Sequence, residues 1–474
     1  MKTISKSIIP INQTFYHIDN KKVMTWENVL RDDLDFRAIT FFCSLGFMLD
    51  DDTYSKKIKV CKPAVEYQLN NDEVIIKEKN GWKWNYEPEE RSFGDVLCEF
   101  TELFERIIHE STFEKSILLP ISGGLDSRTL IVPISNRKNL TLASYEFENG
   151  ILETWYGKQF AEHYNIPFFT QKIPKGYLWD TINKIAKQNE CFSDFLHPRQ
   201  VAALNNWKGL GDTILLGHWG DVLFDSHVES DNYSLDEQVN LLQKKILHNG
   251  GVELACDLWN HWGLPGSFSS NIMERLDFLY RGIEIDHPSA RIRAFKSLYW
   301  APRWTSVNLL LFGSIGKPIV PYYHDDMCKF ICTVPERLLK GRKIQIEYIK
   351  KNLPFAATIS WQKYHPLNLN NYKRFNNPLY YPVRVIRKLN RITRTQLFNQ
   401  PKKNLRNWEL QFLGSINIIQ LKKHLTDNKS LLEFIPESIS TNYIKKFQRN
   451  PVKYAHPVSM LLTLALFFQR NNRQ

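Results

Sequence analysis

The chain has 474 residues, of which 43% are hydrophobic and 24% are charged, and its net charge is +12. This composition supplies enough apolar material for two or three cores and excludes overall disorder, while the longest apolar stretch, around residues 460–468, is far shorter than the roughly 20 residues of a membrane-spanning helix. Pro10 and Asn12 interrupt any secretory signal at the N-terminus, and the seven cysteines lack the paired spacing of a disulfide framework. We therefore expect no transmembrane segment and a cytoplasmic location.

The N-terminal part consists of short runs rich in β-forming residues, separated by clusters of Asp, Asn and Gly. Between residues 36 and 86 these runs are AITFFCSLGFML, KIKVC, VEYQL, EVIIKEK and WKWNY. Apolar residues that alternate between such turn clusters are typical of hairpin-connected strands. We predict a small β-rich N-terminal domain over residues 1–90.

The pattern changes its period at Ser92. Apolar residues then recur at steps of three and four from Phe93 to Ile107, which predicts an amphipathic helix. Further along, strand-like runs alternate with helical patterns: the strand-like runs are KSILLPI, TLASYEF, IPFF and DTILLGHWGD, and the helical ones are LDSRTLI and ETWYGKQFAEHY. This alternation predicts an α/β domain, residues 91–474, with a parallel sheet covered on both faces and mainly helices after residue 230.

A basic segment lies near the C-terminus. Residues 363–423 contain thirteen basic residues and one acid, Glu409, so this segment carries the whole excess of positive charge. A polyanion, an anionic membrane surface or an acidic carrier is the functional interpretation. A solvated basic face is the structural one.

One short motif carries chemistry. The sequence Ser122-Gly123-Gly124-Leu125-Asp126-Ser127 follows a predicted buried strand and begins a predicted helix. Two glycines let main-chain N–H groups approach an anion, and a helix N-terminus adds partial positive charge at the same place. The motif predicts a cradle for pyrophosphate, in which the Asp126 carboxylate is placed to hold Mg²⁺ against the phosphates. An ordinary glycine turn is the alternative.

This loop is identified as the signature of the ATP pyrophosphatase (PP-loop) group, and the surrounding chain resembles the synthetase domain of glutamine-dependent asparagine synthetases. TLASYEF resembles the adenine-lining strand of that family, and residues 216–224 resemble its Gly-rich acidic loop, SGEGADELFGG in the typical form. Residues 317–325 resemble the R-x-PFLD segment, and Gly341-Arg342-Lys343 after Val334-Pro335 resembles a later lysine-containing stretch. The resemblance covers about four fifths of the chain.

The resemblance implies a ligase that activates a carboxylate with ATP as an acyl-adenylate, releases pyrophosphate and transfers the acyl group to ammonia or an amine. It implies ATP and Mg²⁺ as cofactors, with Asp126 and Asp221 as metal ligands and Lys343, Asp126 and His218 as catalytic residues. Lys343 would stabilise charge on the phosphate as a point cation. The implied nucleotide-binding residues are Ile121, Ser122, Gly123, Gly124, Asp126, Ser127, Ser144, Leu216, Gly217 and Asp221.

Two departures from the family pattern limit this resemblance. The family's glutaminase nucleophile is a cysteine directly after the initiator methionine, whereas position 2 here is Lys2 and the first cysteine is Cys43. Residues 1–90 therefore resemble a degenerate glutaminase remnant, and the nitrogen must come from elsewhere. His218 stands where the family has a glutamate near the activated carboxylate, which argues against free aspartate and favours a peptide or a sugar acid as the substrate.

Two other classes of protein stay open. A tRNA-modifying PP-loop enzyme would share the loop and suit a basic chain, although the loop lies far from the N-terminus and no CxxC pairs accompany it. A non-catalytic relative that only binds a nucleotide would explain the lost glutamate, although the intact loop and Asp221 argue against it.

Overall fold

The computed structural model describes residues 2–148, 150, 152–197, 200–382, 384–385 and 406–472. Its strands are β1 (Lys2–Ser5), β2 (Phe15–His17), β3 (Val23–Met24), β4 (Ile58–Val60), β5 (Val65–Leu69), β6 (Ile75–Asn80), β7 (Ile117–Pro120), β8 (Leu140–Phe147), β9 (Phe168–Ile173), β10 (Thr213–Leu215) and β11 (Lys317–Ile319). The helices before β11 are α1 (Phe36–Leu45), α2 (Phe93–Thr112), α3 (Leu125–Ile131), α4 (Glu153–Tyr164), α5 (Tyr177–Gln188), α6 (Val201–Trp207), α7 (Gly220–Leu223), α8 (Leu235–Ile246), α9 (Asn249–His261), α10 (Phe268–Arg281), α11 (Pro288–Phe295), a π-helix (Lys296–Thr305) and α12 (Ser306–Leu309). The later helices are α13 (Asp325–Thr333), α14 (Glu336–Leu339), α15 (Lys343–Asn352), α16 (Pro354–Thr358), α18 (Asn407–Gln411), α19 (Ser415–Leu425), α20 (Lys429–Leu432), α21 (Glu437–Arg449) and α22 (Pro451–Asn471).

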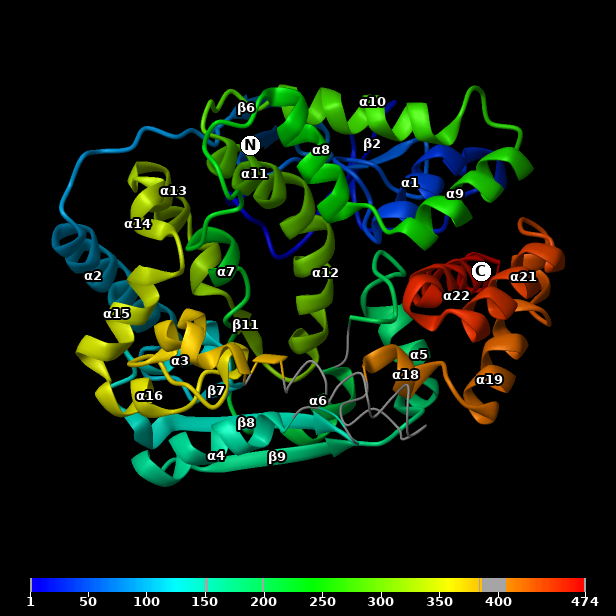
Figure 1. Cartoon of the computed structure of the whole chain (residues 1–474). Coiled ribbons are helices and arrows are strands. Elements are labelled where there is room, and N and C mark those ends of the chain that lie inside the picture. Colours follow the sequence, from blue (N-terminus) through cyan, green and yellow to red (C-terminus); the bar gives the residue numbers. More distant parts are fainter. Residues whose placement is uncertain are drawn as a thin grey trace.

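Five strands form a parallel sheet in the order β11-β10-β7-β8-β9 (Figure 1). Leu118 of β7 pairs with Ile214 of β10 on one side and with Thr141 of β8 on the other. Leu118 is fully buried, as is typical of a central strand in a sheet covered on both faces. Helix α3 packs against β7, and α4 packs against β8 and β9. The predicted parallel α/β architecture with a helical C-terminal part is confirmed.

The order of the sheet reverses next to β7. The chain runs from β7 to β8 and β9 on one side, and it then returns to β10 and β11 on the other. The loops that follow β7 and β10 therefore leave the carboxyl edge of the sheet in opposite directions. Open α/β sheets form their ligand-binding crevices at such a point.

Two three-stranded antiparallel sheets, β1-β5-β6 and β3-β2-β4, make the N-terminal part β-rich, as predicted. The runs KIKVC, VEYQL and EVIIKEK form β4, β5 and β6. In β5 the residues alternate between buried and half-buried positions, which is the pattern that predicts a strand. Strands β1, β2 and β3 have no counterpart among the predicted runs, and WKWNY forms no strand.

The prediction of a strand in AITFFCSLGFML is wrong, because most of this run belongs to helix α1. The Asp35 side chain accepts the Ala38 N–H at the start of the helix, and Gly46 ends it in the left-handed conformation with φ 80°. Residues 38–45 are all buried, so the helix has no polar face. Without a polar face the sequence lacks the periodicity that distinguishes a helix from a buried strand.

The N-terminal part packs against the C-terminal end of the chain. The Tyr54 and Phe467 rings stack with centroids 3.7 Å apart. Asn471 accepts the Val29 N–H at 2.8 Å and donates to the Val29 carbonyl oxygen at 2.7 Å. One apolar core contains residues from both ends of the chain. The domain boundary near residue 90 stays a prediction.

Among the described residues, α22 is the one helix long and apolar enough to cross a membrane by length and composition. Within its most apolar window, 78% of the residues are buried inside the protein, where the helix contacts α9, α20 and α21. Buried core helices have the same composition, so α22 is weak evidence for a membrane span.

Candidate active site

The predicted phosphate loop lies between β7 and α3 at the carboxyl edge of the sheet. The Ser122 N–H donates to Ser127 Oγ at 3.1 Å, and the Gly124 N–H donates to Ser122 Oγ at 3.3 Å. The two hydroxyl oxygens are 3.2 Å apart. Both serines of the motif therefore hydrogen-bond within the turn.

Gly123 lies at the tip of this turn, where no side chain would fit. A Cβ atom there would be 2.8 Å from Gln362 Cβ and 2.8 Å from the Tyr156 ring. Neither Gly123 nor Gly124 has a positive φ. At Gly123 the motif therefore needs glycine for close packing rather than for an unusual backbone conformation. The Gly123 N–H donates to Glu153 Oε2 at 3.1 Å.

A second loop, residues 216–221 between β10 and α7, packs directly on the first. A Cβ atom at Gly217 would be 2.9 Å from the Asp126 carbonyl carbon, and one at Gly220 would collide with Asp126 Oδ1. Because neither glycine leaves room for a side chain, the second loop can lie against Asp126. The structure thus brings together the two motifs that the resemblance assigns to one site.

The Asp126 carboxylate is held by residues at the start of α15. Arg342 forms an ion pair with Asp126 Oδ1, and Gln345 Nε2 donates to the same oxygen at 3.1 Å. Burial raises the pKa of Asp126 to about 6; Arg342 and Gln345 oppose this shift, and the nearby Asp221 carboxylate adds to it. At pH 7 Asp126 is therefore ionised and able to act as a hard oxygen ligand.

Arg342 is a site residue that sequence reasoning missed. It lies in the left-handed region with φ 60° immediately before α15, and its side chain is only 11% exposed. The predicted catalytic residue Lys343 is the first residue of α15 and is exposed. The only sequence signal is a pair of adjacent cations after Gly341. That signal does not show which cation reaches Asp126.

His218 and Lys296 add nitrogen groups near Asp221, which is itself exposed. The residue His218 is exposed, but desolvation by the surrounding protein lowers its pKa to about 4, against the effect of Asp221. Lys296 Nζ lies over the rings of Trp219 and Trp300, 5.8 and 5.3 Å from their centroids. Burial lowers the pKa of Lys296 to about 8, with Asp221 opposing the shift. At pH 7 His218 is neutral and Lys296 is mostly charged.

Three of the predicted nucleotide-binding residues are buried in or beside strands. The Ile121 N–H donates to the Ala143 carbonyl at 2.8 Å, and the Leu216 N–H donates to the Ile319 carbonyl at 2.8 Å. Ser144 in β8 is only 3% exposed. These residues are parts of the sheet edge, and their contact with a nucleotide stays a prediction.

Asp126 and Asp221 fit Mg²⁺ as part of a ligand set that phosphate oxygens complete. Proteins commonly hold Mg²⁺ with one or two carboxylates together with substrate phosphates and water. Within the described part of the chain, no group of three or more His, Cys, Asp or Glu could hold a metal ion. The binding of Mg²⁺ by Asp126 and Asp221 stays a prediction.

Arg128, directly after the motif, is a second residue that sequence reasoning missed. It is completely buried. Its guanidinium donates to the carbonyls of Ala356, Ile359 and Ser360 at 3.1, 2.9 and 2.9 Å. These bonds hold the segment after α15, which carries Gln362, against the phosphate loop. Its position beside the SGGLDS motif was the available signal.

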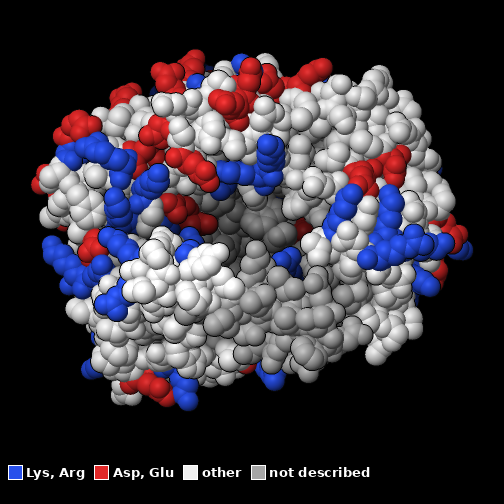
Figure 2. Space-filling view, viewed as in Figure 1, with Lys and Arg blue, Asp and Glu red and all other residues white. Residues whose placement is uncertain are grey.

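Figure 2 shows the surface hollowed near the centre of the molecule, where Figure 1 places α7 and α12. Side chains of Lys, Arg, Asp and Glu lie around this hollow (Figure 2). Helix α7 directly follows the second loop. A polar, charged ligand suits such surroundings.

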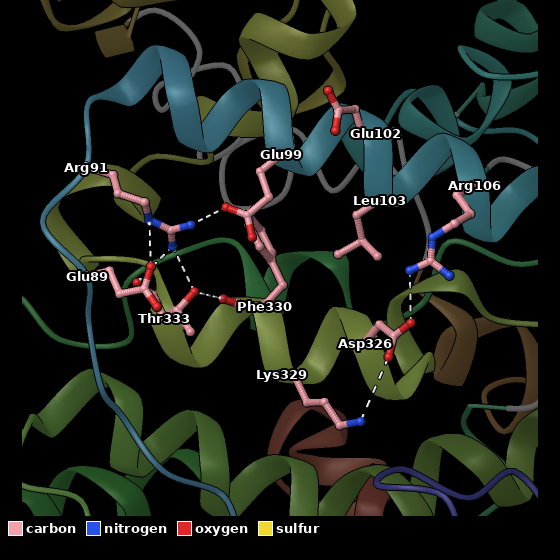
Figure 3. Close-up of a pocket in the computed structure, with 10 residues that line it drawn as sticks. All are labelled: Glu89, Arg91, Glu99, Glu102, Leu103, Arg106, Asp326, Lys329, Phe330 and Thr333. Atoms are coloured by element: carbon pink, nitrogen blue, oxygen red, sulfur yellow. Dashed lines mark hydrogen bonds and ion pairs between the residues drawn. The ribbon is translucent and has the colours of Figure 1, made fainter.

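A separate pocket of about 550 Å³ lies between α2 and α13 (Figure 3). Apart from Glu102, its charged side chains pair with one another; examples are Arg91 with Glu99, Arg106 with Asp326 at 2.9 Å, and Lys329 with Asp326 at 3.9 Å. Because these charges compensate one another, we interpret the pocket as a seam between the two helices.

The basic segment is described only in part. Arg387, Lys388, Arg391, Arg394, Lys402 and Lys403 lie outside the described residues. Arg384 lies over the rings of Phe375 and Tyr381, 5.8 and 5.5 Å from their centroids. The anionic partner of this segment stays a prediction.

Among solved structures, the chain is similar to the glutamine-dependent NAD+ synthetase from Acinetobacter baumannii in complex with adenosine diphosphate (ADP), at 11% sequence identity and a TM-score of 0.19. The match covers 84% of this chain and 50% of that chain, so this chain spans about half the length of the structure it matches. No protein-family model matches the chain, and no curated protein matches it in sequence.

Proposed function

We propose that the chain is an ATP-dependent carbon–nitrogen ligase of the PP-loop type, similar to the synthetase part of asparagine synthetases. One observation carries this proposal: the SGGLDS loop after β7 meets the Gly-rich loop after β10 where the order of the sheet reverses, with Asp126 between them. Ligands of open α/β sheets bind at this edge. The two carboxylates there fit a nucleotide that arrives with its metal.

In the proposed reaction a substrate carboxylate attacks the α-phosphate of ATP, and pyrophosphate leaves. An amine then displaces AMP from the acyl-adenylate, and an amide forms. Asp126 and Asp221 would hold Mg²⁺, whose positive charge would offset the negative charge of the phosphates. Arg342, beside Asp126, is placed to stabilise negative charge that develops on the phosphate. The alternative for this last role is Lys343.

We propose a peptide side chain or a sugar acid, rather than free aspartate, as the carboxylate substrate. The His218 ring is neutral at pH 7, since its pKa is lowered to about 4, and it offers no negative charge to the amino group of aspartate. Lys296, over the Trp219 ring, provides a cation for an acidic group of the substrate.

Ammonia or an amine from outside the chain would supply the nitrogen. Lys2, at the position of the family nucleophile, lies in β1 and pairs with Glu73 at 2.7 Å. Cys43 is completely buried in α1, and burial raises the pKa of its thiol far above the usual value. A thiol must ionise to act as a nucleophile, so Cys43 is a poor substitute.

Pyrophosphate release tests this proposal. With Mg-ATP and ammonia, the purified protein should release pyrophosphate with an acid from a panel of peptide and sugar acids, and only slowly with aspartate. Asp126→Ala should abolish this release together with Mg²⁺-dependent ATP binding. Asp180→Ala, which removes an exposed carboxylate of α5, is the control. Equal pyrophosphate release by wild type and Asp126→Ala would refute the site. Efficient asparagine formation would show that free aspartate is the substrate.

A further inference from the structure

A carboxylate of the protein itself, that of Glu153, is hydrogen-bonded to the phosphate loop. The main-chain N–H groups of residues 122–124 each have an internal acceptor: Ser127 Oγ for Ser122, Ser122 Oγ for Gly124, and Glu153 Oε2 for Gly123. The first two acceptors are neutral hydroxyls, which can also donate to a phosphate after rotation. The third acceptor is a carboxylate, and it takes the N–H at the tip of the turn.

We propose that Glu153 competes with the phosphates of ATP for the Gly123 N–H and thereby weakens the binding of ligands that carry pyrophosphate. The inference rests on the proposed function, because it takes the loop as the phosphate site. A main-chain N–H that donates to an anion forms one of the stronger hydrogen bonds in proteins. Two anions beside one N–H also repel each other, more strongly in a partly desolvated site than in water.

The turn keeps its shape without the charge of Glu153. The Gln362 N–H donates to the Gly123 carbonyl at 3.1 Å, and Tyr156 and Gln362 both pack closely against Gly123. The segment that carries Gln362 is fixed in turn by Arg128 through three carbonyl groups. Removal of the charge at Glu153 should therefore change the electrostatics of the loop and leave its backbone in place.

Glu153 has other support when it gives up the Gly123 N–H. The Gln362 side-chain amide donates to Glu153 Oε1. Glu153 is also the first residue of α4, and the N-terminus of a helix stabilises negative charge. The carboxylate can therefore yield to a phosphate and keep these interactions, which makes the competition reversible.

Calorimetric titrations with inorganic pyrophosphate, Mg-ATP and adenosine test the competition in the full chain. Glu153→Gln keeps the size of the side chain and an acceptor for the Gly123 N–H, but it removes the charge. We expect pyrophosphate and Mg-ATP to bind roughly tenfold more tightly to this variant. Adenosine, which has no phosphate, should bind with unchanged affinity. Glu162→Gln removes an exposed charge from the same helix and should change none of the three affinities.

Equal or weaker pyrophosphate binding by Glu153→Gln, when wild type binds Mg-ATP, overturns the inference and leaves the proposed function standing. An equal change in the affinity for adenosine would assign Glu153 a structural role and also overturn it. If no variant binds pyrophosphate or Mg-ATP, the proposed function fails, and the inference fails with it. Should Glu153→Gln not fold, Glu153→Asp withdraws the charge from Gly123 by one methylene, and it should likewise bind pyrophosphate more tightly than wild type.

Discussion

At Asp126, the fold is more stable with a protonated carboxyl, whereas the proposed function requires an ionised one. Its pKa of about 6 is higher than the value near 3.9 of an unperturbed aspartate, so the folded state favours the protonated carboxyl. The stabilisation that the protonated Asp126 carboxyl gives to the folded state is complete below about pH 4, and it is lost as the pH rises through about 6. At neutral pH the protein therefore carries a charge that burial disfavours and that Mg²⁺ binding requires.

We expect Asp126→Asn to increase the free energy of unfolding at pH 7.5 by about 1 to 3 kcal/mol, because a neutral amide avoids the cost of the buried charge. The same variant should lose Mg²⁺-dependent ATP binding. Urea unfolding at pH 7.5 and pH 4 measures the effect, which should vanish at the lower pH. Asp180→Asn, at an exposed position, is the control. A less stable Asp126→Asn at pH 7.5 would show that the ion pair with Arg342 outweighs the burial.

Arg342 and Lys343 can be separated by substitution, since of these two cations Arg342 forms the ion pair with Asp126. We expect Arg342→Ala to reduce the rate of pyrophosphate release roughly 100-fold, the usual effect of losing a group that stabilises transition-state charge. Lys343→Ala should reduce it only a few-fold. The rates are measured at saturating Mg-ATP with the substrate found in the acid panel. If Lys343→Ala reduces the rate of pyrophosphate release more than Arg342→Ala does, Lys343 has the catalytic role.

Among the elements, those with a clear boundary or a polar face could be predicted from the sequence. Helices α3 and α4 have the bounds that were predicted for LDSRTLI and ETWYGKQFAEHY. Helix α1 could not be predicted because it is buried on every side. The two loops of the site follow from their glycines, whereas Arg342 and Glu153 reach the loop from segments distant in sequence. Local patterns contain no information on such contacts.

The burial of Cys43 in α1 gives a prediction for the N-terminal part. We expect the purified protein to release no glutamate from glutamine, with or without ATP, because this thiol is buried and its pKa is raised. A coupled glutamate assay measures this, with a known glutaminase as the positive control. Hydrolysis that Cys43→Ala abolishes would show that the N-terminal part retains a working nucleophile.

For the whole molecule, the uneven distribution of charge predicts how it meets an anionic partner. We expect charge reversal at Arg384, Arg387, Lys388 and Arg391 to weaken binding to heparin and to flatten its dependence on salt, since attraction between exposed charges is screened over about 8 to 10 Å. Charge reversal at Lys77 and Lys79, two exposed residues of β6, is the control. If both variants elute from a heparin column at the same salt concentration as wild type, the segment is a solvated basic face.

The contact between Val29 and Asn471 has a consequence for synthesis on the ribosome. At 5 to 20 residues per second, Asn471 is translated roughly 20 to 90 s after Val29. During this interval Tyr54 also lacks Phe467, its stacking partner, so part of the apolar surface of the N-terminal region remains uncovered. We expect this surface to be open to chaperones and to transient contacts until the last helix emerges.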